Sequence, residues 1–150
     1  MQASGHELLL EIIPAKTLAR SPDTVYRALK RLYNLDIYPE WWKLEPMSVA
    51  QWQAIDALIA ERDPYCRGVV LLGLNASMDE LSAGFRDARS SKSCRGFAVG
   101  RTIFQEPSRA WLAREIDDEA LIRRVRTNFE RLVETWREMR GVSSRQGLAT

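Results

Sequence analysis

Histidine and lysine are both scarce in this chain of 150 residues. His6 is the only histidine, and four of the 22 basic residues are lysines: Lys16, Lys30, Lys43 and Lys92. Zinc catalysis usually recruits several histidines, and Ser-His or Cys-His nucleophiles need a well-placed imidazole. Both classes of hydrolase are therefore disfavoured. If the protein is an enzyme, lysine, arginine and carboxylate groups must carry its chemistry.

The chain also has few cysteines, no long apolar run and little net charge. Cys66 and Cys94 lie far apart, which predicts reduced thiols rather than a disulfide or a metal site. The longest uncharged apolar run, residues 68–74, is too short to cross a bilayer, and the N-terminal residues lack a basic leader. The net charge of +2 gives no strong field for nucleic acid or membrane. We therefore expect a cytoplasmic domain with no metal, cofactor, nucleic acid or membrane partner.

Four short apolar segments divide the sequence. They span residues 7–13, 41–45, 68–74 and 96–104. Nearly continuous apolar composition is typical of parallel strands that are covered on both faces. Helices are expected between and after them: beginning at Ser21, after Ser48, at Ser77, over residues 107–115, and from Asp117 to Arg140. This alternation predicts an α/β fold with right-handed crossovers, a domain over residues 1–141 and a disordered tail over 142–150.

Lys43 lies between tryptophan and leucine in the segment WWKLE. An ammonium group in a buried strand is costly unless it is paired or has lost its proton. A neutral lysine amine can attack a carbonyl and form a Schiff base, and a carboxyl group on a neighbouring strand can then move protons. Glu11, at the end of the first apolar segment, can supply that carboxyl group. Lys43 and Glu11 are therefore the candidate catalytic residues.

Two turns that follow predicted strands have the composition of a phosphate site. A glycine permits close approach of the backbone, N–H groups at a helix start attract anions, and an arginine grips phosphate with its planar guanidinium. The candidate phosphate-binding residues are Gly73, Leu74, Asn75 and Ser77 after the third segment, and Gly100 and Arg101 after the fourth.

Each of these residues also has a structural interpretation. Lys43 could form an ion pair with Glu11 or Glu45, or extend past a tryptophan towards solvent. The sequence GLNAS resembles any tight strand-to-helix turn, and Arg101 could be a salt-bridged strand end. The enzyme hypothesis depends on the coincidence of lysine, glutamate, a helix start and arginine at predicted strand ends.

The longer motifs resemble a known family. LLLEIIP, YPEWWKLEP, RDPYCRGVVLLGLNAS, RGFAVGRTIF and WLAREIDDEALI are very similar to the C-terminal aldolase-like domain of bacterial bifunctional proteins of inositol catabolism. In these proteins that domain is fused to a sugar kinase, 5-dehydro-2-deoxygluconokinase. The resemblance covers residues 6–140, and the domain is in turn similar to class I aldolases of the tagatose-bisphosphate type, which are (β/α)8 barrels.

The resemblance implies a fold, a reaction and roles for the site residues. The chain would supply the last four β/α units of the barrel, with Lys43 as the Schiff-base lysine, Glu11 as the proton carrier and the turns at Gly73–Ser77 and Gly100–Arg101 on the phosphate. The implied reaction is retro-aldol cleavage of 2-deoxy-5-keto-gluconate 6-phosphate, a phosphorylated sugar acid, to dihydroxyacetone phosphate and malonate semialdehyde.

The same resemblance implies that half of the barrel is missing, so a partner is expected. The partner would be a second copy in a homodimer, or a separate N-terminal half barrel or kinase chain. No sugar-kinase nucleotide motif occurs in the 150 residues, so no kinase activity is expected. The competing hypotheses are a non-catalytic half-barrel module associated with a carbohydrate kinase, and a truncated fragment.

Overall fold

The computed structural model of the protein describes residues 5–15, 21–74 and 76–141, so the expected tail over 142–150 lies outside the described residues. The strands are β1 (Leu9–Glu11), β2 (Trp41–Leu44), β3 (Gly68–Leu72) and β4 (Cys94–Ala98). The helices are α1 (Thr24–Tyr33), α2 (Val49–Arg62), α3 (Met78–Asp87), the short 3-10 helix η1 (Ala88–Ser90), α4 (Arg101–Leu112) and α5 (Asp118–Met139). The predicted α/β alternation is confirmed.

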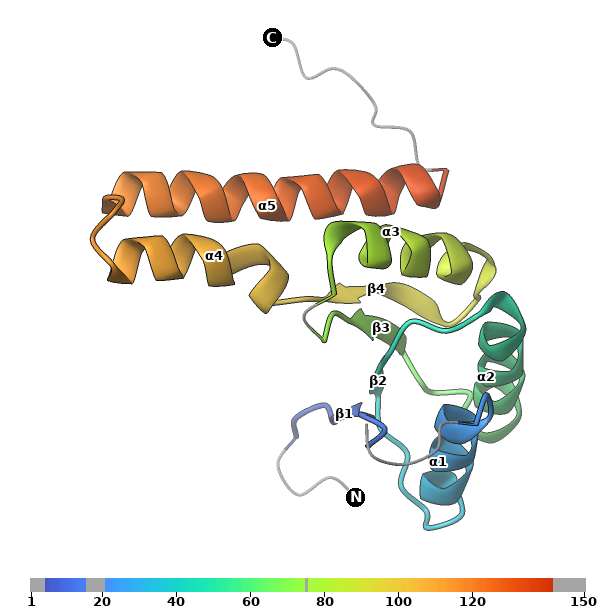
Figure 1. Ribbon diagram of the computed structural model, residues 1–150. Helices are drawn as coiled ribbons and strands as arrows, with labels where there is room; N and C mark the ends of the chain where they lie inside the picture. The colour runs from blue at the N-terminus through green and yellow to red at the C-terminus, as the bar shows by residue number, and fades with distance from the viewer. Residues whose placement is uncertain (1–4, 16–20, 75, 142–150) are drawn as a thin grey trace, which may run out of the picture.

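The four strands form one parallel sheet in the order β1-β2-β3-β4. Sequential order means that each right-handed crossover places its helix on the same side of the sheet. Figure 1 shows this arrangement, with α1, α2, α3 and α5 on one side of the strands. A doubly wound sheet reverses its strand order and carries helices on both faces, so this topology is compatible with half of a barrel.

The core lies between the sheet and these helices. Trp42 and Leu44 of β2 and Val69 and Leu71 of β3 point towards the helices and are fully buried. Leu9 of β1, on the other face, is 47% exposed. Residues of β1 and β2 alternate in this way because a strand directs successive side chains to opposite faces. The expectation of coverage on both faces is therefore wrong for β1 and β2, whereas every residue of β3 except half-buried Val70 is buried.

Side-chain caps explain where three of the helices begin. Ser48 and Ser77 form capping boxes with Gln51 and Glu80, and both helices begin where they are expected. Asp117 caps α5 by accepting a hydrogen bond from the N–H of Ala120 at 2.8 Å. Helix α1 begins at Thr24 with Asp23 as its N-cap residue, and Ser21 lies before it, so the expected N-cap at Ser21 is wrong.

The segment over residues 96–104 is only partly strand. Strand β4 ends at Ala98, and Arg101 is the first residue of α4 rather than the end of a strand. Pro107, the expected first residue of this helix, lies inside it, where it cannot donate a hydrogen bond to the carbonyl of Ile103. The side-chain amide of Asn128, on α5, donates to that carbonyl at 2.8 Å instead. This contact satisfies the carbonyl that the proline leaves unpaired.

Two polar clusters hold helices α2 and α5 to the loop before β4. The carboxylate of Asp56 on α2 accepts hydrogen bonds from the backbone N–H groups of Lys92 and Ser93 and from the hydroxyls of Ser91 and Ser93. The guanidinium of Arg140, next to the end of α5, donates to the carbonyls of Ala88, Arg89, Ser91 and Cys94. Both clusters lie on the helix-covered side of the sheet.

Candidate functional site

Lys43 and Glu11 meet on the uncovered face of the sheet. They occupy paired positions on β2 and β1, and Lys43 Nζ lies 2.9 Å from Glu11 Oε1. Glu11 is the last residue of β1 and Lys43 the third of four in β2, so both lie towards the carboxyl edge of the sheet. The side chain of Lys43 is 24% exposed and that of Glu11 is 37% exposed. The structure therefore brings an amine and a carboxylate within proton-transfer distance at an open surface.

The register of this pair is held at the beginning of β1 by residues that the sequence patterns do not single out. The carboxylate of Glu7 accepts a hydrogen bond from Trp41 Nε1 at 2.9 Å and forms an ion pair with Arg67 Nη2 at 2.8 Å. The N–H of Leu8 donates to Glu40 Oε2 at 2.7 Å. Strand β1 has only three residues, so these side-chain contacts add to a short backbone ladder. They join residues more than 30 positions apart, which leaves no periodic signal in the sequence.

The turn before α3 is closed by its own side chains. The N–H and hydroxyl of Ser77 donate to Glu80 Oε2 at 2.7 Å and 2.9 Å, and the N–H of Glu80 donates to Ser77 Oγ at 3.3 Å. The backbone and side-chain hydrogen bonds from Ser77 hold the pKa of Glu80 below its usual value. Asp79 adds a second carboxylate to this first turn. Negative charge at this helix start makes Ser77 less suited to bind a phosphate.

The start of α4 lacks the negative charge found at the start of α3. Its N-cap residue is Gly100, so no side chain caps the first N–H groups of the helix. Its first turn contains no acidic residue. Arg101, the first helical residue, is exposed. N–H groups at a helix start and a guanidinium both favour an anion. The hydroxyl of Thr102 donates to the carbonyl of Ala76 at 2.9 Å, so this turn is tied to the one before α3.

The remaining predicted residues belong to the turn after β3. Gly73 is buried, and a Cβ at this position would lie 3.0 Å from a methyl group of Val99, so glycine allows the ends of β3 and β4 to approach. Leu74 is half-buried with φ of +43°, a left-handed conformation that turns the chain towards α3. Asn75 lies outside the described residues. The described site residues thus lie in the last two residues of neighbouring strands or in the turns that follow them, at one edge of the sheet.

Other chemistries have less support in the described part of the chain. Cys66 and Cys94 are free, and burial raises the pKa of each thiol to about 11, which leaves little thiolate at neutral pH. No group of three or more His, Cys, Asp or Glu side chains among the described residues could hold a metal ion. None of the described helices has the length and apolar character needed to cross a membrane.

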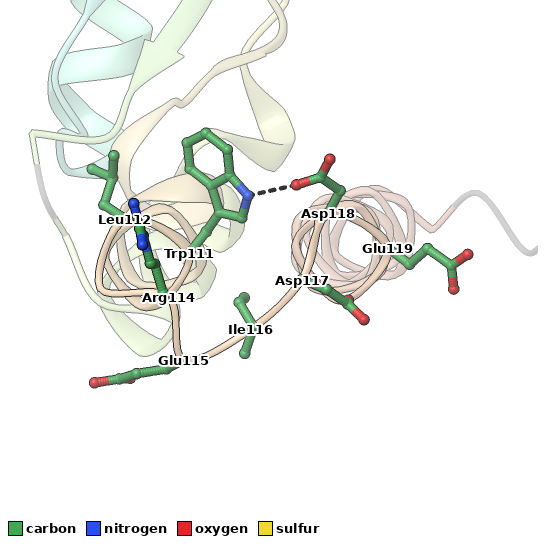
Figure 2. Close-up of a pocket in the computed structure, with 8 residues that line it drawn as sticks. All are labelled: Trp111, Leu112, Arg114, Glu115, Ile116, Asp117, Asp118 and Glu119. Carbon is green, nitrogen blue, oxygen red and sulfur yellow. Dashed lines mark hydrogen bonds between the residues drawn. The ribbon is translucent and has the colours of Figure 1, made fainter.

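A hollow of about 870 Å³ lies at the turn between α4 and α5, at the end of this helical hairpin that is remote from the sheet. Figure 2 shows that Trp111 and Asp118 face each other across it, and their hydrogen bond is 2.7 Å long. Asp117, which also lines the hollow, caps α5. These polar groups hold the hairpin together, and the hollow contains none of the predicted site residues.

The chain matches a family of bacterial proteins over nearly its whole length. Residues 1–140 match the family described as "Uncharacterized protein conserved in bacteria (DUF2090)". A search of curated proteins found no match.

Proposed function

The chain belongs to the DUF2090 family, and we propose that the open face of its sheet carries the Schiff-base site of a class I aldolase. One observation carries the proposal: Lys43 and Glu11, two side chains with the required chemistry, lie 2.9 Å apart at the carboxyl edge of a parallel sheet. Catalytic residues of α/β barrels lie at this edge. The motif resemblance to aldolase-like domains of inositol catabolism adds to this observation.

In the proposed reaction Lys43 Nζ attacks the ketone of a phosphorylated sugar acid. Glu11 accepts a proton from the ammonium form of Lys43, which frees the amine, and later returns protons as the carbinolamine loses water. As the hydroxyl β to the protonated imine gives its proton to the Glu11 carboxylate, the bond between the α and β carbons breaks to an aldehyde and an enamine. The enamine then takes a proton at carbon from Glu11, and water hydrolyses the imine, which releases the ketone and restores Lys43. With 2-deoxy-5-keto-gluconate 6-phosphate, as the resemblance implies, the products are dihydroxyacetone phosphate and malonate semialdehyde.

The start of α4 is the proposed phosphate site. Barrel enzymes frequently bind phosphate at the loops after the last two strands and at the start of a short extra helix. In such a barrel helix α4 would take that position, because it follows β4 directly and α5, which contacts α3, comes next in the chain. Arg101 and the N–H groups after Gly100 would hold the phosphate. Because the turn before α3 is acidic, we assign it a smaller part.

Borohydride trapping tests the lysine assignment. The chain is incubated with dihydroxyacetone phosphate and sodium borohydride, and peptide mass mapping then locates the reduced adduct. We expect the adduct on Lys43 and its loss in Lys43→Arg. Lys30→Arg is the matched control, because Lys30 is an exposed lysine on α1, and it should be trapped like wild type. A folded protein with no adduct, or with equal labelling of Lys43 and Lys30, would refute the proposal.

A non-catalytic module that completes or regulates a carbohydrate kinase is the second candidate. The exposure of Leu9 on the uncovered face favours it, because exposed apolar sheet surface is suited to a protein partner. On this hypothesis the Lys43–Glu11 ion pair is structural. Trapping discriminates between the two, since an ion pair without substrate chemistry gives no reduced adduct.

A further inference from the structure

A hollow of about 350 Å³ lies at the amino ends of β2 and β3, away from the edge of the sheet that carries Lys43 and Glu11. It is formed by the loop before β2, residues 38–40, and by the end of α2 and the loop before β3, residues 62–65. We propose that this hollow binds a small organic molecule that carries an ammonium group. The inference goes beyond the proposed function and does not depend on it.

Asp63 is the residue that points to a ligand. Its side chain lines the hollow but is only 6% exposed, and its buried Oδ2 atom has no hydrogen-bond partner among the described residues. Asp63 is also the C-cap residue of α2, where the helix dipole disfavours a negative charge. Burial, helped by the charge of Glu40, raises the pKa of Asp63, although the N–H groups of Tyr65 and Cys66 oppose this. A cation beside this carboxylate would therefore be stabilising.

The protein does not supply this cation from its own neighbouring side chains. Arg62 also lines the hollow, but its guanidinium donates to Oδ1 of Asn34 at 3.0 Å. Glu40 adds a second negative charge to the lining, and its carboxylate accepts a hydrogen bond from the N–H of Leu8 at 2.7 Å. In the described part of the chain no lysine or arginine forms an ion pair with Asp63. The acidic end of the hollow is thus suited to a cation from outside.

The rest of the lining is suited to the organic part of such a ligand. Tyr65 is 88% exposed and Tyr38 is 43% exposed, and the ring of Tyr38 packs against Tyr33 with 5.5 Å between centroids. Aromatic faces attract ammonium groups, and the volume lies within the range of small-molecule sites. An anion, by contrast, would meet two carboxylates. A turn of the Asp63 carboxylate towards the hollow would let Oδ2 accept a hydrogen bond from the ammonium group.

Calorimetric titration with benzylammonium chloride tests the inference, and benzyl alcohol is the uncharged probe of similar shape. We expect saturable binding of benzylammonium and at least about tenfold weaker binding of the alcohol. Asp63→Asn keeps the shape of the side chain and should raise the Kd for benzylammonium by at least about tenfold. Tyr65→Ala should raise it about two- to fivefold through the loss of a cation–π contact. Glu61→Gln is the matched control, because Glu61 is an exposed acid on α2 outside the hollow, and its Kd should match wild type.

Three results would overturn the inference. The first is the absence of saturable binding by folded wild type at up to about 10 mM benzylammonium. The second is equal affinity for benzylammonium and benzyl alcohol. The third is an unchanged Kd in Tyr65→Ala, which is expected to fold because Tyr65 is exposed, so the test stands even if Asp63→Asn does not fold. Amide chemical shifts should change at residues 38–40 and 62–66, and changes confined to another surface would likewise contradict the assignment.

Discussion

The two faces of the sheet differ in what they carry. The face towards the helices carries Trp42, Leu44, Val69 and Leu71, all without exposed surface. The opposite face carries an ion pair and apolar side chains that remain partly exposed, although its residues alternate with the buried ones along the same strands. One set of strands thus builds a core on one side and a partly exposed surface with an ion pair on the other.

This difference sets how much each face contributes to stability. Burial of the helix-side residues supplies the hydrophobic free energy of folding, at about 25 cal/mol per Å² of apolar surface. The open side supplies less of it, because its side chains remain partly exposed. A site on a surface backed by a rigid core can hold its geometry while a substrate or partner reaches it.

The largest expected loss of stability comes from truncating a leucine in the core. The same substitution on the open face provides the comparison. Leu44→Ala should reduce the free energy of unfolding by about 2–5 kcal/mol, because it leaves a cavity in the core. Leu9→Ala should cost about 1 kcal/mol or less, because Leu9 keeps nearly half of its surface exposed. Urea unfolding at low protein concentration measures both changes.

The same pair of variants tests what covers the open face. If a second copy does so, the cost of Leu9→Ala rises with protein concentration and the cost of Leu44→Ala does not. Equal costs for the two variants at low concentration would contradict the difference between the faces.

A smaller contribution to the free energy of unfolding, one that depends on pH, is expected from Asp56 on α2. Burial alone would raise the pKa of Asp56, but hydrogen bonds from Ser93, Lys92 and Ser91 outweigh it and lower the pKa. The unfolded carboxyl group therefore binds its proton at higher pH than the folded one. The stability that the ionised group provides is complete above about pH 4 and is lost as the pH falls through the lower folded value.

Asp56→Asn tests this dependence directly. At neutral pH it should reduce the free energy of unfolding by about 1–2 kcal/mol, because several charge-assisted hydrogen bonds become neutral ones. The difference from wild type should close as the pH falls below about 4. Urea unfolding at a series of pH values measures it, and a difference independent of pH would assign the loss to packing instead.

Much of the fold could be predicted from local patterns. Apolar segments and capping signals located the four strands and most helices, because these features depend on neighbouring residues. The limits of α4 could not be predicted, since Pro107 is normally a boundary signal. Here Asn128, from another helix, satisfies the carbonyl that Pro107 leaves unpaired. The coverage of only one face was also missed, because it depends on tertiary arrangement rather than on local composition.

The candidate site, like the fold, could be predicted only in part from the sequence. Lys43 and Glu11 were found because each stood out chemically in an apolar segment, and the parallel register brings them together. Glu7 was missed, although its carboxylate binds both Trp41 and Arg67. Its partners are distant in the sequence, and an acidic residue near the beginning of a chain has no distinctive pattern.

The smallest effect on stability is expected from the ion pair itself. Lys43→Gln should change the free energy of unfolding by less than about 1 kcal/mol, because partly exposed pairs gain little over solvation by water. Glu11→Gln and the double variant complete a cycle whose coupling energy should be equally small. Urea unfolding of these variants, in parallel with borohydride trapping, compares the two properties. Loss of the adduct without loss of stability would indicate that the pair serves chemistry. A coupling of several kcal/mol would instead make the pair a structural element, and the two faces of the sheet would then contribute to stability in the same way.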